Sequence, residues 1–168
     1  MPVSSSVFPE ELNEAQTALV SFGQYDLRST PMQMAMVTSA IANQGIIYSP
    51  QLIDRVVSNN LELLSDPQPQ VFGSPISQST AGLLTQMMFE SVEVGAAGNA
   101  KIPGMAVAGK TGTAENGLDQ PFTYWFTGFA PAENPELVVT VVVEGVDQSA
   151  TGNSIAAPIG RKLLESVR

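Results

Sequence analysis

The sequence contains no cysteine and no histidine. Without cysteine, disulfide bonds, thiolate metal sites and cysteine nucleophiles are excluded. Without histidine, the commonest general base and the commonest metal ligand are missing too. If the chain takes part in hydrolysis or acyl transfer, proton transfer falls to lysine, aspartate, glutamate or tyrosine. We expect neither a metal site nor a cofactor.

Basic residues are also scarce: seven Lys and Arg stand against sixteen Asp and Glu, a formal charge of −9. A nucleic-acid partner needs a basic footprint, so none is expected. No apolar stretch approaches the roughly 20 residues that cross a membrane, and the first residues do not resemble a signal peptide. Hydrophobic residues make up 43% and charged residues 14% of the 168 positions. This composition predicts a single globular, soluble domain over residues 1–168.

The clearest helix is predicted over residues 31–44. Thr30 followed by Pro31 and, three residues after Thr30, by Gln33 is typical of a helix start, and Gly45 is typical of a helix end. Apolar residues at helical spacing are expected to pack in the core; they are Met32, Met36, Val37, Ala40 and Ile41.

Three more helices are predicted, over residues 10–21, 78–94 and 153–167. The second has Ser77 as its N-cap and an apolar side, formed by Ala81, Leu84, Met88 and Val92. Between the helices predicted over 31–44 and 78–94, residues 52–57 and 61–64 are expected to form a hairpin that turns at Asn59-Asn60.

The last third of the chain has the pattern of a sheet. Residues 105–115, 123–131 and 136–145 are three extended segments whose short connections suit neighbouring antiparallel strands. From Val138 to Val143 only Thr140 is polar, so both faces of that strand should be covered, one of them by the final helix. The expected class is α/β of the α+β type, an antiparallel sheet with covering helices.

The segment GMAVAGKTGTAE, residues 104–115, permits two interpretations. From Gly104 it fits the phosphate-binding pattern G-x-x-x-x-G-K-T, and from Lys110 it offers K-T-G-T, a motif of penicillin-recognising serine enzymes. A phosphate loop requires an apolar strand before Gly104 and a helix from Lys110. The upstream residues EVGAAGNAKIP and the glycines that follow Thr111 favour neither element.

As an exposed strand beside a cleft, the same segment suits carboxylate binding. Lys110 supplies a positive charge, and Thr111 and Thr113 supply hydroxyls two residues apart. Gly112 has no side chain, so a substrate backbone can lie against the strand. A motif as short as Lys-Thr-Gly also recurs by chance, however. On this motif alone, an ordinary exposed strand without a binding role remains an alternative.

An ordered set of segments resembles the class B penicillin-binding proteins. The set comprises FGQYDLRSTPMQMAMVTSAIANQG, AVAGKTGTAE, WFTGFAP, ELVVTVVVEG and AAPIGRKLLE. The resemblance runs from about Phe22 to the chain end and implies the C-terminal portion of the penicillin-binding transpeptidase or serine β-lactamase-like fold.

The resemblance also implies roles for the matched residues. Lys110 would shape the electrostatics of the cleft and orient a serine of the family's second motif. Thr111 and Thr113, with Gly112 between them, would bind the carboxylate of a D-Ala-D-Ala stem peptide or of a β-lactam. The backbone N–H of Thr113 would be one of two oxyanion donors.

Two of the family's motifs are absent. The Ser-x-x-Lys motif requires a serine three positions before a lysine. The residues at that position before Lys101, Lys110 and Lys162 are Gly98, Val107 and Ile159, so the sequence contains no Ser-x-x-Lys. The triplet Ser58-Asn59-Asn60 matches Ser-x-Asn, but it follows the helix that the family's motif precedes, and we reject it.

We therefore expect a C-terminal part of a peptidoglycan D,D-transpeptidase, inactive alone, whose serine lies outside these residues. Its expected partners are the N-terminal part of the domain or a second copy. The parent protein would act on the outer side of the cytoplasmic membrane through an anchor absent from these residues.

Three alternatives remain: a non-catalytic module that binds peptidoglycan or a partner protein, a nucleotide-binding protein, and a β-lactamase relative. The last would need a residue that activates a water, and Glu115 and Asp119 are instead expected to be solvated loop charges.

Overall fold

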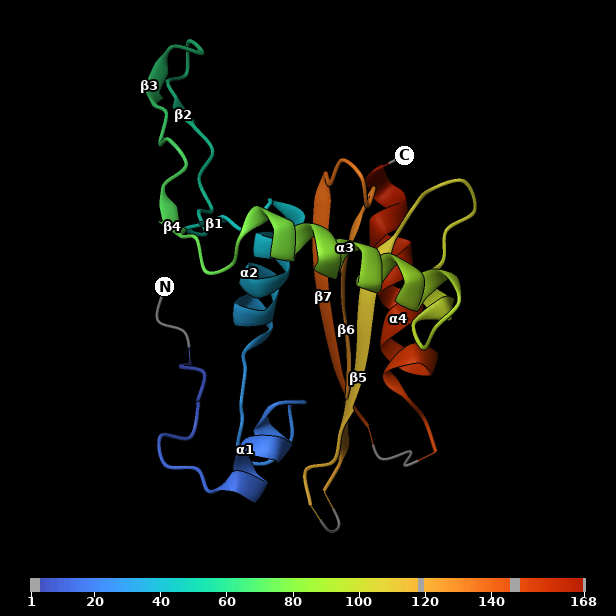
Figure 1. The fold of residues 1–168 in the computed structure, drawn as a ribbon. Coiled ribbons are helices and arrows are strands. Elements are labelled where there is room, and N and C mark those ends of the chain that lie inside the picture. Colours follow the sequence, from blue (N-terminus) through green and yellow to red (C-terminus); the bar gives the residue numbers. More distant parts are fainter. Residues whose placement is uncertain (1–3, 118–119, 146–148, 168) are drawn as a thin grey trace.

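The computed structural model describes residues 4–117, 120–145 and 149–167. Its centre is a three-stranded antiparallel sheet formed by β5 (Ala108–Ala114), β6 (Phe122–Ala130) and β7 (Leu137–Gly145), in the order β5-β6-β7. The three extended segments expected from the sequence, and the α+β class, are confirmed. Figure 1 shows helix α4 behind the sheet, helix α3 crossing in front of it and helix α2 to its left.

Helix α4 (Gly152–Leu164) covers one face of the sheet and is followed by the short 3-10 helix η2 (Glu165–Val167). Tyr124 and Phe126 of β6 are buried against Ala156 and Ala157 of this helix. A Cβ added to Gly160 would lie 2.2 Å from Phe126 Cδ1, so a glycine lets the helix approach the ring. The predicted final helix is confirmed, beginning one residue earlier, after the N-cap Thr151.

Helix α2 (Pro31–Ala42) packs on the other face of the sheet, against β6 and β7. Thr30 caps it, its Oγ1 accepting the N–H of Gln33 at 3.1 Å. Buried Thr38 forms a 2.7 Å hydrogen bond with Thr127, which in turn lies 2.7 Å from Thr140 on β7. This chain of hydroxyls joins the helix to both strands.

The helix predicted over 31–44 is thus confirmed, although it already ends at Ala42, and its predicted core stripe is wrong in part. Ala40 is buried, whereas Met32 and Val37 are exposed. The helix contacts the sheet through the face that carries Thr38, and Met32 and Val37 lie outside that face. Every residue from Val138 to Val143 is at least partly buried between α2 and α4, as expected.

Helix α3 (Gln78–Glu93) lies along β5 and is capped by Ser77. Its predicted apolar side is confirmed, with Ala81, Met88 and Val92 buried. Met88 packs with Ala108 and Phe129 in a second, smaller core cluster. After α3, the 3-10 helix η1 (Gly98–Ala100) packs against α4.

The N-terminal segment is less packed. Helix α1 (Glu14–Val20) is shorter than the predicted 10–21 and buries only Val20. Asn13 begins it through a capping box with Gln16. A backbone bridge between Val7 and Arg28 ties the first described residues to the stretch before α2, and the N–H of Thr30 donates to Ser6 Oγ at 3.2 Å.

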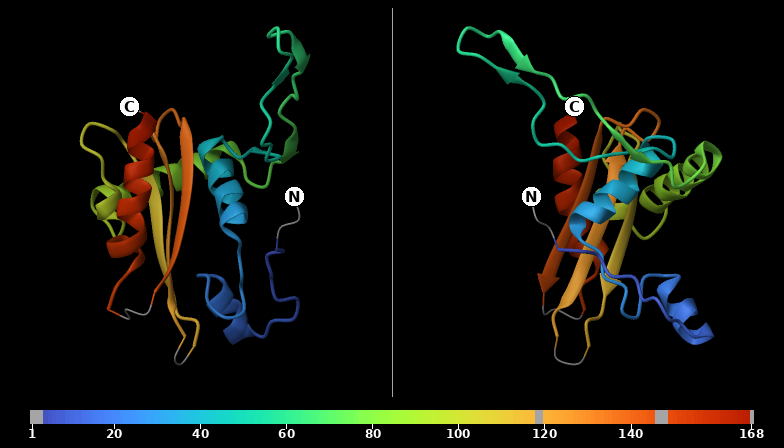
Figure 2. Two further views of the ribbon diagram at one scale, coloured as in Figure 1. Left: turned by 180° about the vertical axis from the view of Figure 1, so that it is seen from behind. Right: turned by 90° about the vertical axis from the view of Figure 1, so that its left-hand side faces the viewer.

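Residues 46–73 form an arm that projects from the body (Figures 1 and 2). At its base β1 (Ile47–Tyr48) pairs with β4 (Val71–Gly73), and further out β2 (Val56–Val57) pairs with β3 (Leu63–Ser65). The predicted hairpin is confirmed, but with shorter, exposed strands. Ser58, the first residue of the rejected Ser-x-Asn triplet, accepts N–H bonds from Asn60 and Glu62 at the end of this arm.

Candidate functional site

A groove of about 840 Å³ runs beside β5, the outer strand of the sheet. All four residues of the sequence-predicted site, Lys110, Thr111, Gly112 and Thr113, line it. The structure therefore brings these residues to one groove along the edge of the sheet, beside residues from α4, β6 and the stretch before α2.

The strand presents these four residues in two sets. In the antiparallel register Lys110 lies opposite Thr127 and Gly112 opposite Trp125. Thr111 and Thr113 alternate with them, opposite the buried rings of Phe126 and Tyr124. Successive strand residues point to opposite faces, so the two threonines share the side of the sheet that α4 covers, and Lys110 lies on the side of α2.

Lys110 is exposed, and its Nζ donates to the backbone carbonyl of Thr111. It has no ion-pair partner within the part of the chain that the structure describes. It is also the one charged residue among the described residues that line the groove. In a chain of net charge −9, the groove is thus a local site of positive charge.

The two threonine hydroxyls are held by backbone groups. Thr111 is only 8% exposed, and its Oγ1 donates to the carbonyl of Ala96 at 3.3 Å. Thr113 Oγ1 accepts the N–H of Gly152, at the start of α4, at 3.0 Å. A hydroxyl has one hydrogen and two lone pairs, so the hydrogen of Thr113 remains available for another acceptor.

The opposite wall consists of residues from the stretch before α2 together with Met34 of that helix. Phe22, Gln24 and Leu27 are its larger side chains, and Gly23 allows its turn with φ +84°. Phe22 is 66% exposed. This wall supplies apolar and amide groups and no charge.

Sequence reasoning missed several groove residues, among them Trp125, Thr127 and Asn153. The antiparallel register of residues 105–115 and 123–131 would have pointed to Trp125, because it faces Gly112 across the sheet. No local pattern marks Asn153, whose position follows from how α4 returns to the sheet.

The nucleotide-binding alternative is wrong. Lys110 and Thr111 lie inside β5, whereas a phosphate loop needs a helix that begins at these residues. Within the described ranges, no group of three acidic residues could hold a metal ion. Glu115 is exposed, as expected for a solvated loop charge, and Asp119 lies outside the described residues.

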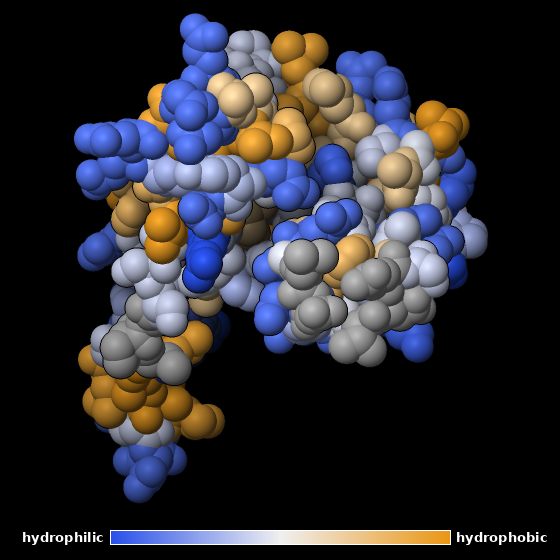
Figure 3. Space-filling model, turned by 90° about the horizontal axis from the view of Figure 1, so that it is seen from below, coloured by the Kyte–Doolittle hydropathy of each residue, from blue (hydrophilic) through white to orange (hydrophobic). Residues whose placement is uncertain are grey.

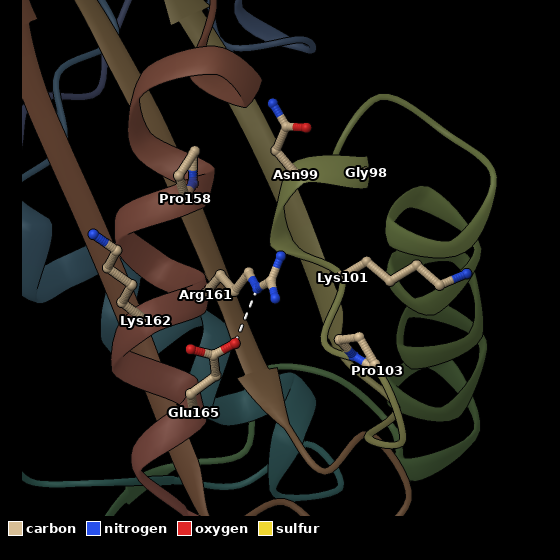
Figure 4. Close-up of a pocket in the computed structure, with 8 residues that line it drawn as sticks. All are labelled: Gly98, Asn99, Lys101, Pro103, Pro158, Arg161, Lys162 and Glu165. Atoms are coloured by element: carbon tan, nitrogen blue, oxygen red, sulfur yellow. Dashed lines mark hydrogen bonds and ion pairs between the residues drawn. The ribbon is translucent and has the colours of Figure 1, made fainter.

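A second groove of about 650 Å³ lies between α4 and the residues after η1 (Figure 4). It contains three cations: Arg161, whose Nε donates to Glu165 at 3.0 Å, Lys101, which forms an ion pair with Glu93, and Lys162, which points away from the groove in Figure 4. Its cations are thus paired or turned outward. The first groove remains the better candidate for binding an anion.

Comparisons with known proteins identify the family. A model of the penicillin-binding protein transpeptidase domain matches residues 3–165. The peptidoglycan D,D-transpeptidase PbpA of Mycolicibacterium smegmatis is 38% identical over 169 residues, which cover 98% of this chain and 34% of that protein. The chain thus spans about a third of the length of the curated relatives it matches.

Comparison with solved structures indicates the same family. Penicillin-binding protein A from M. tuberculosis, as a ceftriaxone acyl-enzyme complex, superposes with a TM-score of 0.90 at 35% identity, over 98% of this chain and 38% of that one. Penicillin-binding protein 2B from Streptococcus pneumoniae gives a TM-score of 0.80 at 27% identity, over 96% and 28%. The chain belongs to the penicillin-binding protein transpeptidase family and corresponds to the C-terminal region of that domain.

Proposed function

We propose that this member of the penicillin-binding protein transpeptidase family binds the terminal carboxylate of a D-Ala-D-Ala stem peptide, or of a β-lactam, in the groove beside β5. One observation carries the proposal: among the described residues, Lys110 is the groove's one charged side chain and has no carboxylate partner. The chain as a whole carries nine more negative than positive charges. An anionic ligand therefore fits this groove better than a neutral or cationic one.

Lys110, Gly112 and Thr113 have distinct parts in this proposal, and Thr111 supports the strand, since its hydroxyl hydrogen already goes to Ala96. Lys110 supplies the charge, and charge-assisted hydrogen bonds stabilise a complex by roughly 1.5–3 kcal/mol each. Thr113 donates its hydroxyl hydrogen to the carboxylate, since its oxygen already accepts from Gly152. Gly112 leaves the edge of the strand open, so that a peptide can lie along β5 as an added strand.

The reaction step belongs to the same proposal. The backbone N–H of Thr113 is proposed as one of two donors to the oxyanion of an acyl-transfer intermediate, and loss of such a donor costs about 3 kcal/mol of transition-state stabilisation. The attacking serine of the family stands three residues before a lysine, and none of the three lysines here has that neighbour. These 168 residues therefore contribute recognition rather than nucleophilic attack.

A non-catalytic role in binding peptidoglycan is the second candidate. The absence of Ser-x-x-Lys favours it, and it uses the same groove and the same carboxylate. Peptide binding supports both candidates equally. Covalent capture of penicillin by the isolated chain, detected by mass spectrometry as a serine-linked adduct, would contradict both.

The test is an NMR titration of the chain with diacetyl-L-Lys-D-Ala-D-Ala. Shifts are expected at residues of β5, and the same peptide with a C-terminal amide should bind roughly 10- to 100-fold more weakly because the charge is lost. Lys110→Met should have a similar effect, and the matched control Lys162→Met none. Equal affinity for acid and amide would refute carboxylate recognition.

The exposed apolar residues of the arm support a further part of the proposal, a partner chain. Leu52 and Leu61 are 84% and 82% exposed, and Figure 3 shows apolar side chains gathered on the arm at its lower left. We propose that a second copy or another part of the transpeptidase covers them. A strictly monomeric chain in sedimentation at high concentration would count against self-association.

No described helix is long and apolar enough to span a bilayer. Action of the parent protein at the outer side of the membrane is part of the proposal.

A further inference from the structure

The two threonine hydroxyls of β5 are held by segments that are themselves joined. Thr111 contacts Ala96, just before η1, and Thr113 contacts Gly152, the first residue of α4. Two hydrogen bonds connect these segments through one pair of asparagines. The N–H of Asn99 donates to Asn153 Oδ1 at 3.0 Å, and Asn99 Nδ2 donates to the carbonyl of Asn153 at 3.0 Å.

These contacts close a ring around the edge of the sheet. From Thr111 it passes through Ala96 to Asn99, across to Asn153, and through Gly152 back to Thr113. Figure 4 shows Asn99 on η1 beside the first turn of α4. Asn153 is also one of the residues that line the groove, so the ring lies directly behind the proposed carboxylate site.

Helix α4 approaches the strand too closely for a side chain at its first residue. A Cβ added to Gly152 would lie 2.4 Å from the carbonyl oxygen of Gly112 and 2.5 Å from that of Trp125. The first N–H of a helix has no partner within the helix. Here Thr113 accepts it, and the direction of this bond depends on where the start of α4 is held.

We propose that Asn99 and Asn153 are positioning residues: they hold the segments that bind Thr111 and Thr113, and so set the Thr113 hydroxyl for carboxylate binding. That the ligand is a carboxylate rests on the proposed function; the positioning of the threonine does not. If the asparagine pair is removed, the start of α4 can shift relative to η1, and the Gly152 N–H no longer fixes the rotation of the Thr113 side chain. A ligand must then order that hydroxyl when it binds, which weakens binding.

The direct test measures the threonine without any ligand. In the full chain, three-bond couplings from Thr113 Cγ2 to its backbone nitrogen and carbonyl carbon report χ1, and hydrogen exchange reports the Gly152 N–H. The double variant Asn99→Ala/Asn153→Ala should average the Thr113 rotamers and speed exchange of the Gly152 amide at least about 10-fold. The amide of Phe126, inside the sheet, should not change.

Two variants separate positioning from general damage. Asn153→Asp keeps the acceptor for the Asn99 N–H and suits the first turn of a helix, so it should retain the wild-type couplings. Asn43→Ala removes a comparable exposed asparagine, whose Nδ2 donates to Ile46 at 3.2 Å outside the groove, and should leave both readouts unchanged. Unchanged couplings and exchange in the double variant would overturn the proposal.

Titration with diacetyl-L-Lys-D-Ala-D-Ala then separates this proposal from the proposed function. If Thr113→Val binds as tightly as the wild type, carboxylate recognition by Thr113 fails, whatever the asparagines do. If Thr113→Val weakens binding but the double asparagine variant does not, the positioning role fails alone. Weakening of at least about 5-fold in the double variant, with Asn43→Ala unaffected, is the expected result.

Discussion

The two walls of the groove are built differently. The wall formed by β5, β6 and the start of α4 stands on the main core, where Tyr124 and Phe126 are fully enclosed. The wall formed by residues 22–29 follows α1, which buries only Val20. The first wall carries the cation and the held hydroxyls, and the second carries apolar and amide groups.

Under the proposed function, this difference gives each wall its own task. Groups that recognise a charged ligand bind best when they are held in place beforehand, and the packed wall provides that support. The other wall has few buried apolar contacts, so its local opening should require little free energy. It can adapt to the apolar part of a ligand or of a partner chain.

The largest effect is expected from a comparison of two phenylalanines, Phe126 in the core beneath the packed wall and Phe22 on the other wall. Phe126→Ala should destabilise the chain by about 3–5 kcal/mol, because the ring is 0% exposed and its removal leaves a cavity. Phe22→Ala should change stability by less than about 0.5 kcal/mol, because that ring is 66% exposed. Urea unfolding followed by circular dichroism measures both. Similar losses in the two variants would show that the walls are equally packed.

The second test concerns how closely α4 meets the packed wall. Gly152→Ala places a Cβ against two backbone oxygens, which cannot rotate away, and should cost about 1–3 kcal/mol. The matched control is Gly82→Ala in α3, where an added Cβ meets nothing within 4 Å. Helix propensity predicts that this control is stabilising by about 0.5–1 kcal/mol. A neutral Gly152→Ala variant would mean that α4 is free to withdraw from β5.

The sequence predicted the sheet and the helices packed on it better than the stretch before α2. The starts of α2 and α3 followed from Thr30, Pro31 and Ser77, because capping is local chemistry. The sheet followed from its apolar strands and short connections. The exposure of Met32 and Val37 was missed, since helical spacing does not show how wide a contact the sheet offers.

The groove was predicted only along β5. Lys110, Thr111, Gly112 and Thr113 are contiguous, so a short motif was enough to place them together. Phe22, Trp125 and Asn153 come from three separate parts of the chain. Their meeting depends on tertiary packing, which no local pattern contains.

The third test is the contact that ties α2 to the sheet. Thr38→Val keeps the shape of the side chain but removes its 2.7 Å hydrogen bond to Thr127, and should destabilise by about 1 kcal/mol. A double-mutant cycle with Thr127→Val isolates the pair, with an expected coupling of at least about 0.5 kcal/mol. No coupling would mean that apolar packing alone holds α2, and that the wall before it is attached even more weakly than proposed.

The smallest effect is expected from the ion pair on the outer side of α4, behind the packed wall. Arg161 lies in the last turn of α4 and Glu165, four residues later, is its C-cap; their side chains are 41% and 36% exposed. Pairs of this kind contribute about 0.3–0.5 kcal/mol, less at high salt. A double-mutant cycle with Arg161→Ala and Glu165→Ala, in 0.05 M and 0.5 M sodium chloride, measures the coupling. A coupling above about 1 kcal/mol would mean that charge, and not only the packing of Phe126 against Gly160, holds α4 on the sheet. The contrast between the two walls would then depend on ionic strength, whereas apolar packing predicts that it does not.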